Sequence, residues 1–196
     1  MTDDKTILEA QLRECYARTV YTHKTQEKCA DILLNWLKYI KSLQICFSVI
    51  ATGGAVTTLF KGFASAEVIT ALFSAALLAL NLFIKENDLG AIAQQHRQAG
   101  AKLWLIRERY LSLLTDMQAE GVSLESIRSR RDNLIEEQYS VYDGAPSTNS
   151  WAYRKARKAL KEQEEMTFSD EEIDQTLPKA LRITSNDTAV AKKSTS

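Results

Sequence analysis

Two stretches without a charged residue constrain this chain more than any other feature. The first covers residues 42–60 and the second residues 68–84, which makes them nineteen and seventeen residues long. A helix needs about 20 apolar residues, within a range of about 17–25, to cross the hydrocarbon of a bilayer. Neither stretch has the polar stripe of a helix that lies on the surface of a soluble bundle. We therefore expect membrane-spanning helices at about 42–60 and 64–84, rather than the buried centre of a soluble bundle.

The charges next to these stretches predict the orientation of the two helices. Basic residues flank the pair on its outer sides, whereas the short connection carries a single lysine, Lys61. The flanking basic residues are Lys24, Lys28, Lys38, Lys41, Lys85, Arg97 and Lys102. Because basic flanks tend to stay in the cytoplasm, we expect both termini in the cytoplasm and the connection outside.

Apolar residues outside the two stretches recur in a seven-residue pattern that is typical of a coiled coil. The pattern covers residues 5–41 before the first stretch and residues 85–118 after the second. If the chain turns near residue 62, residues whose numbers add up to about 124 lie opposite each other. The sequence therefore predicts a long antiparallel two-helix hairpin that crosses the membrane and extends into the cytoplasm as a coiled coil. We call the contact line between 5–41 and 85–118 the seam.

One layer of the seam is polar. The predicted register places His96 opposite Gln26, in a layer that also contains Thr22. A single polar layer usually fixes the register of a coiled coil. A pH-sensing role is the alternative, because histidine titrates near neutral pH. The same register places His23 near Ala101.

The rest of the chain predicts two shorter cytoplasmic helices and a tail. Only seven glycines and two prolines interrupt the 196 residues, which indicates a nearly all-α protein. We expect helices over residues 123–142 and 149–165, joined by a loop that contains a proline. Residues 166–196 are polar and lack periodicity, so we predict a largely disordered tail. Residues 5–165 would then form one domain of an all-α membrane protein.

Small and polar residues follow one face of the second apolar stretch, and two more lie on the first. They are Glu67, Ala71, Ser74, Leu78 and Asn81, with Ser48 and Thr52 on the first stretch. Such residues allow two helices to pack closely within one hairpin. Alternatively they line a conduit, with Glu67 at its outer mouth and Leu78 as an apolar constriction. The sequence leaves both interpretations open.

The sequence carries no motif for catalysis. The glycine-rich segment at residues 51–56 lacks the Lys-Ser/Thr of a phosphate-binding loop. Two isolated histidines and three cysteines have no spacing typical of metal ligands. We therefore expect no enzymatic activity, no catalytic residue, no cofactor and no metal. The net charge of zero gives no reason to expect direct nucleic-acid binding.

Residues 139–160 carry the most specific resemblance to a known family. A tyrosine-bearing helix is followed by an Ala-Pro-Ser-Thr loop and by a helix that opens with Ala-Tyr. The residues are Tyr139, Tyr142, Ala145, Pro146, Ser147, Thr148, Ala152 and Tyr153. Together with the two membrane stretches, this segment resembles the SLATT-domain family of prokaryotic two-transmembrane effectors, over about residues 5–165.

The resemblance implies a membrane effector of a bacterial antiviral defence system. Such a protein would lie in the inner membrane, contact lipid and form homo-oligomers. It would form a pore or disrupt the membrane, causing growth arrest or death of the infected cell (abortive infection). The signal would come from a sensor or a nucleotide second-messenger enzyme encoded nearby. The alternative is a membrane-anchored scaffold or sensor that recruits a cytoplasmic partner and conducts nothing.

Overall fold

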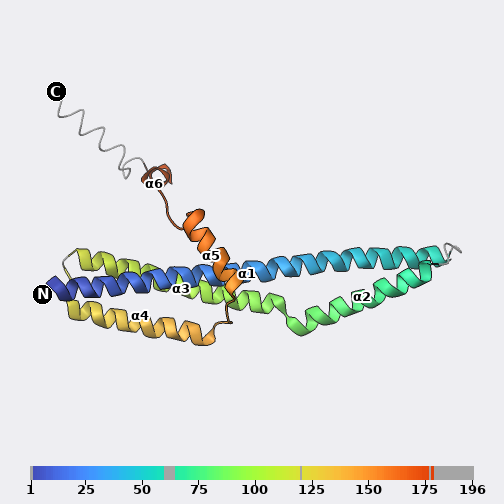
Figure 1. Cartoon of the computed structure of the whole chain (residues 1–196), viewed down its shortest axis with the longest axis horizontal. Coiled ribbons are helices and arrows are strands. Elements are labelled where there is room, and N and C mark those ends of the chain that lie inside the picture. Colours follow the sequence, from blue (N-terminus) through green and yellow to red (C-terminus); the bar gives the residue numbers. More distant parts are fainter. Residues whose placement is uncertain (1, 60–64, 120, 177, 179–196) are drawn as a thin grey trace, which may run out of the picture. The chain divides into compact units, whose positions relative to one another are not determined.

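The computed structural model of the chain describes residues 2–59, 65–119, 121–176 and 178. Every regular element in these residues is an α-helix, which confirms the all-α prediction (Figure 1). The helices are α1 (Thr2–Leu59), α2 (Ala66–Asn87), α3 (Leu89–Gln118), α4 (Leu124–Gly144), α5 (Ser150–Glu162) and α6 (Asp170–Thr176). The chain divides into two compact units, residues 1–156 and 157–196. The predicted outer connection with Lys61 falls on residues 60–64, outside the described residues.

Helix α1 is the long arm of the predicted hairpin, and α2 and α3 together form the other arm, antiparallel to it (Figure 1). The contacts between the arms are those of a chain that turns near residue 62. The Gln44 amide nitrogen donates to Asn81 Oδ1 at 2.6 Å, and the rings of Phe47 and Phe73 meet edge-on, with centroids 5.2 Å apart. A Cβ on Gly54 would clash with the Thr70 hydroxyl. Glycine at this position therefore lets α1 and α2 approach closely.

The two halves of the hairpin bury their apolar residues very differently. We call residues 42–59 of α1 together with α2 the membrane half, and residues 2–41 of α1 together with α3 and α4 the core half. The most apolar segments of both arms are long and apolar enough to cross a membrane. They bury only 6% of their residues in α1 and none in the α2–α3 arm. A core helix of a soluble bundle would be mostly buried, so the soluble alternative does not fit.

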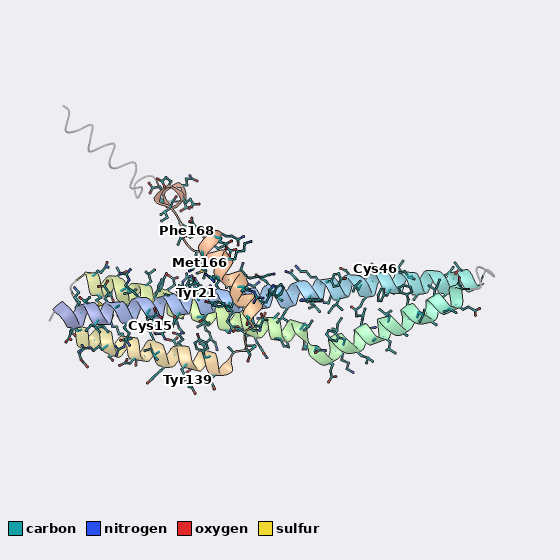
Figure 2. The ribbon with its side chains drawn as sticks, viewed as in Figure 1. Cys15, Tyr21, Cys46, Tyr139, Met166 and Phe168 are labelled. Carbon is teal, nitrogen blue, oxygen red and sulfur yellow. The ribbon has the colours of Figure 1, made fainter. Side chains whose placement is uncertain are left out.

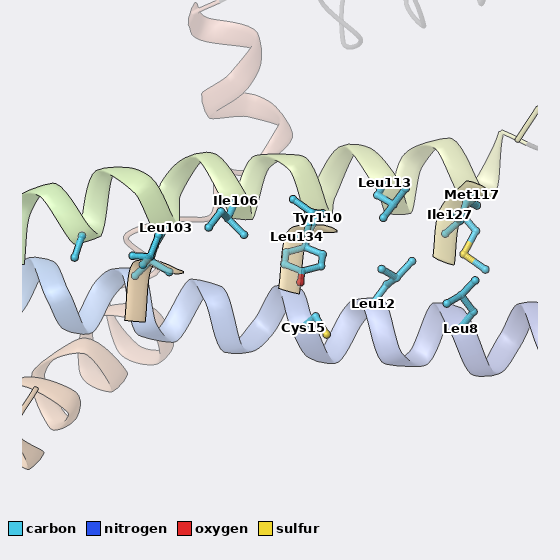
Figure 3. Packing of buried hydrophobic residues seen from close by; sticks show 12 residues of the cluster. Leu8, Leu12, Cys15, Leu103, Ile106, Tyr110, Leu113, Met117, Ile127 and Leu134 are labelled. Carbon is cyan, nitrogen blue, oxygen red and sulfur yellow. The ribbon is translucent and has the colours of Figure 1, made fainter. Parts of the chain in front are cut away.

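The core half has an apolar interior made by three helices. Buried side chains from α1, α3 and α4 interdigitate in this interior. Tyr110 lies near the middle of the cluster (Figure 3). The fully buried side chains include Leu12, Leu103, Ile106 and Ile127. Burying one such residue contributes about 1.5–3 kcal/mol relative to leaving it exposed. This half therefore has a folded core of its own outside the membrane.

The second arm is broken at Asp88, where the sequence predicted a continuous helix. Asp88 has φ 30° and ψ 56°, in the left-handed region, and it ends α2 and begins α3. Its carboxylate accepts a hydrogen bond from the Ala91 backbone N–H at 3.1 Å, which caps α3. Aspartate tolerates this region because its short side chain bonds locally.

Changing Asp88 tests whether the break is built into the sequence. Asp88→Ala loses the cap and keeps the left-handed strain, so it should lower the free energy of unfolding by about 1–2 kcal/mol. Asp88→Asn should be nearly neutral, because asparagine both caps helices and tolerates the left-handed region. Urea unfolding in detergent micelles, followed by circular dichroism, compares the two. If the two variants had the same free energy of unfolding, neither the cap nor the left-handed backbone at Asp88 would matter for stability.

A short helix, α6, lies in the segment that the sequence predicted as tail. Ser169 and Glu172 cap it reciprocally: the Glu172 N–H donates to the Ser169 hydroxyl at 3.3 Å, and the Ser169 N–H donates to the Glu172 carboxylate at 2.9 Å. This is a capping box, for which Ser-x-x-Glu is the sequence signature. Residues 170–176, which the sequence placed in a largely disordered tail, are helical in the structure. Residues 177 and 179–196 lie outside the described residues.

Candidate functional site

A pocket of about 360 Å³ opens beside α1. Four segments of the chain build it: α1, the last turns of α4, the loop after α4, and the first turn of α5. The lining residues are Tyr21, Thr22, Thr25, Gln26, Tyr142, Ala145, Pro146, Ser147, Thr148 and Tyr153. The pocket thus combines most of the loop-and-helix motif with two residues of the polar seam layer.

Local sequence rules explain how the loop reaches α1. Ala145 is extended, with φ −90° and ψ 145°, because a residue that precedes a proline avoids the helical region. Asn149 then starts α5 as its cap, since its side chain accepts from the Ala152 N–H at 2.8 Å. Ala152 is completely buried and belongs to a small cluster with Cys29 and Ile32 of α1. The loop is therefore held at both ends.

The pocket wall is made of hydroxyl groups and tyrosine rings. The hydroxyls of Thr22 and Tyr142 share a hydrogen bond of 2.7 Å between residues 120 positions apart. The rings of Tyr21 and Tyr153 lie with centroids 6.2 Å apart and a 33° tilt. Such offset ring pairs stabilise by about 0.5–1.5 kcal/mol beyond the area they bury. These contacts join α1 to both α4 and α5 around the opening.

Gln26 connects the pocket to the buried seam. Its side chain is buried and lines the pocket, while its carbonyl oxygen accepts from Nδ1 of His96 at 2.5 Å. His96 lies on α3 and is itself buried. The three residues of the polar layer are thus close together in the structure, with Thr22 one helical turn from Gln26. A movement of the Gln26 side chain at the pocket would therefore alter its hydrogen bond to His96 on α3.

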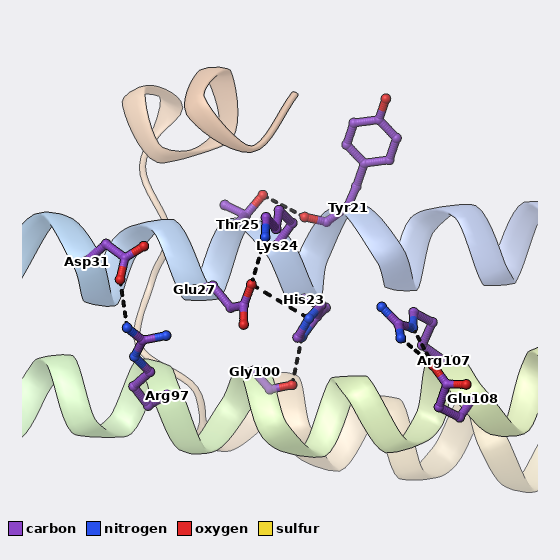
Figure 4. Close-up of polar contacts among 10 residues, drawn as sticks. All are labelled: Tyr21, His23, Lys24, Thr25, Glu27, Asp31, Arg97, Gly100, Arg107 and Glu108. Carbon is purple, nitrogen blue, oxygen red and sulfur yellow. Dashed lines mark hydrogen bonds and ion pairs between the residues drawn. The ribbon is translucent and has the colours of Figure 1, made fainter. Parts of the chain in front are cut away.

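A second buried histidine lies nearby on the α3 side of α1. His23 Nδ1 bonds the Gly100 carbonyl at 2.9 Å, and its Nε2 lies 3.8 Å from a Glu27 carboxylate oxygen (Figure 4). Burial lowers the pKa of His23 below its ordinary value, against the opposing influence of Gly100 and Glu27. Burial likewise lowers the pKa of His96. Burial therefore disfavours the protonated form of both imidazoles in the folded protein.

The core half is expected to lose stability as the pH falls through the range in which the two histidines titrate. A folded-state pKa below the unfolded value of about 6.5 means that only the unfolded chain binds the proton at first. Stability is then fully present above about pH 6.5 and declines below it. Urea midpoints at pH 7.5 and 5.8 measure this decline. His96→Gln removes one titrating group, so the variant should show a smaller decline between the two pH values, and an unchanged one would contradict the explanation.

Tyr139 is the motif residue that lies apart from this pocket. It is 69% exposed and lines a separate hollow of about 310 Å³ together with Tyr142. The residues around that hollow include Tyr110, whose hydroxyl is buried and points toward Cys15 (Figure 3). Figure 2 shows Tyr139 on α4 and Tyr21 on α1, both in the core half. Tyr142 is the residue that the two hollows share.

The candidate membrane face is exposed in the hairpin. Helix α2 meets α1 through other residues, among them Thr70 and Phe73. Asn81 of the α2 set bonds α1 through Gln44. All members of the set are exposed: Glu67, Ala71, Ser74, Leu78 and Asn81 on α2, and Ser48 and Thr52 on α1. Most of this face is therefore available for contact with lipid or with another protomer.

Comparison with known proteins gives one match. A family model described as the SMODS and SLOG-associating 2TM effector domain family 4 matches residues 8–172. Neither the curated proteins nor the solved structures contain a significant match. The matched region includes both membrane helices, the pocket, nearly all of the seam and the first residues of α6. It covers most of the chain.

Proposed function

Because the chain belongs to the SMODS and SLOG-associating 2TM effector domain family and is thus a membrane effector of conflict systems, we propose that it forms an oligomeric pore. The pore would open in the bacterial inner membrane and stop growth or kill the infected cell. The protein would act without catalysing a reaction. Two helices cannot enclose an aqueous path by themselves, so several protomers must assemble.

The exposed face of α2 is the observation that carries this proposal. A hairpin that only anchored the protein could pack its small and polar residues inward, where they satisfy one another. Here Ser74 is exposed instead, and so is Glu67 near the end of the membrane half. Exposed polar groups at membrane depth are costly unless protein or water surrounds them. Assembly of protomers through this face would supply those surroundings.

We place the core half, and with it both termini, in the cytoplasm. The positive-inside rule supports this orientation, because the basic flanks lie on the core side of the membrane half. The partner would be a sensor or a nucleotide second-messenger enzyme encoded nearby, in keeping with the family's association with SMODS and SLOG proteins. Its signal would then be received by the folded core half and passed to α1 and α2.

Dye release from liposomes and ion leakage from induced cells test the proposal. We expect leakage that grows with protein density, because assembly is required. Glu67→Gln should reduce the preference for cations, since it removes the carboxylate nearest the outer mouth. Glu125→Gln, on α4 of the core half, is the matched control and should leave selectivity unchanged.

A scaffold is the competing function. Its expected signature is full-length protein in the membrane fraction without leakage at any density. That result would exclude the pore and leave a membrane anchor that displays the core half to a partner. Leakage with unchanged selectivity in Glu67→Gln would instead keep the pore and remove Glu67 from its mouth.

A further inference from the structure

The pocket beside the seam has an unusual composition for a surface hollow of this protein. None of its ten lining residues carries a formal charge, although a quarter of the whole chain is charged. Three of the ten are tyrosines, and four carry aliphatic hydroxyl groups. Its volume of about 360 Å³ falls within the range of about 300–1,000 Å³ that small-molecule sites occupy.

The absence of charge among these residues excludes recognition of a phosphate or a carboxylate. Proteins hold such anions with arginine, lysine or the free N–H groups of a helix N-terminus. The first turn of α5 adjoins the pocket, but Asn149 already accepts from the N–H of Ala152 and of Tyr153. A purely aliphatic ligand fits poorly, because it would offer no hydrogen-bonding group to the polar side chains that line the pocket.

We propose that this pocket binds an uncharged planar heteroaromatic molecule of the size of a nucleobase or a nucleoside. Its ring faces stack on tyrosine side chains, a contact that tolerates different rings because every ring has a π-face. Its polar edge exchanges hydrogen bonds with the hydroxyls of Thr22 and Thr148 and with the Gln26 amide. Heteroaromatic edges offer both donors and acceptors, which suits hydroxyl and amide partners.

The contacts around the pocket show what a bound molecule would change. Tyr142 and Thr22 bond each other across the opening at 2.7 Å, so a ligand edge competes for the same two hydroxyls. Gln26 bonds His96 of α3. A ligand that hydrogen-bonds the Gln26 amide would therefore also affect this contact between α1 and α3. Binding would therefore fasten α4 and α5 to the α1–α3 pair. A resulting effect on leakage rests on the proposed pore function, whereas binding itself does not.

Binding to the purified full-length protein in nanodiscs tests the inference. The probes are adenosine, guanosine, cytidine and uridine, with ribose as the ring-free control and adenosine monophosphate as the charged one. At least one nucleoside should bind below 1 mM and raise the Tm, as any ligand of the folded state does. Ribose should not bind, and the monophosphate should bind no tighter than adenosine. Failure of all four nucleosides, or tenfold tighter binding of the monophosphate, would overturn the inference.

Variants locate the binding on the protein. Tyr153→Leu removes a half-exposed ring from the pocket wall, and Thr148→Val removes an exposed hydroxyl while keeping the side-chain shape. Each should weaken nucleoside binding about tenfold. Tyr139→Leu, an equally radical change of an exposed tyrosine outside this pocket, should leave it unchanged. If Tyr153→Leu and Thr148→Val bound the nucleoside as tightly as Tyr139→Leu does, the proposed site would be refuted. Binding without any leakage would overturn the proposed pore and leave this inference standing.

Discussion

Replacing Leu72 by arginine should make membrane insertion of α2 less favourable by about 3 kcal/mol. Leu72 lies near the centre of the expected span and is 65% exposed, so the guanidinium would face lipid. A charge at the centre of a lipid-facing helix must reach water by snorkelling or by thinning the bilayer. Glycosylation-based insertion of α2 into microsomes measures the difference directly.

Leu111→Arg is the matched control for Leu72→Arg. Leu111 is also exposed, at 45%, but it lies on α3 in the core half. There the arginine would point into water, and surface substitutions of this kind usually change stability by no more than about 0.5 kcal/mol. If the chain were a soluble bundle, both substitutions would be harmless. Impaired insertion in Leu72→Arg but not in Leu111→Arg would therefore distinguish a membrane-spanning α2 from a soluble bundle.

Leu12→Ala is expected to lower the free energy of unfolding of the core half by about 2–5 kcal/mol. Leu12 is fully buried in the cluster that joins α1, α3 and α4. Its removal loses both the transfer free energy of the side chain and the contacts around the cavity that remains. Urea unfolding of the protein in detergent, followed by the fluorescence of its tryptophans, gives the difference.

Ile7→Ala provides the comparison on the same helix. Ile7 is 62% exposed, so its truncation should cost less than about 0.5 kcal/mol. Similar losses for both variants would mean that α1, α3 and α4 do not form a packed core. A large loss for Leu12 alone would establish that the core half is folded by its own interior, independently of the lipid that surrounds the membrane half.

The sequence was sufficient to predict the long elements because their signals are strong and local. Two charge-free stretches set the spans, and the seven-residue pattern set the seam in which Ile106 and Tyr110 are buried. The break at Asp88 escaped prediction because its backbone departs from a helix at one residue only. Asn87 and Asp88 are both residues that favour turns, which is the signal that could have indicated it.

The candidate site was predictable in its parts and not in its assembly. The resemblance supplied Tyr142 and Tyr153, and the seam pattern supplied Gln26, but nothing in their spacing indicated that they share a pocket. That arrangement depends on how α4 and α5 pack on α1, through contacts between residues about 120 positions apart. Tyr21 was missed for the same reason: a tyrosine on a long helix carries no local sign of its neighbours.

The two arms of the hairpin differ in how they transmit movement. Helix α1 runs without interruption for 58 residues, about 87 Å at 1.5 Å per residue, so a twist or push applied at one end arrives at the other. The α2–α3 arm has a joint at Asp88, where a change of direction needs only one residue to move. We therefore expect α1 to act as the lever that carries a signal across the membrane boundary. The Asp88 joint would let α2 follow without unpacking α3.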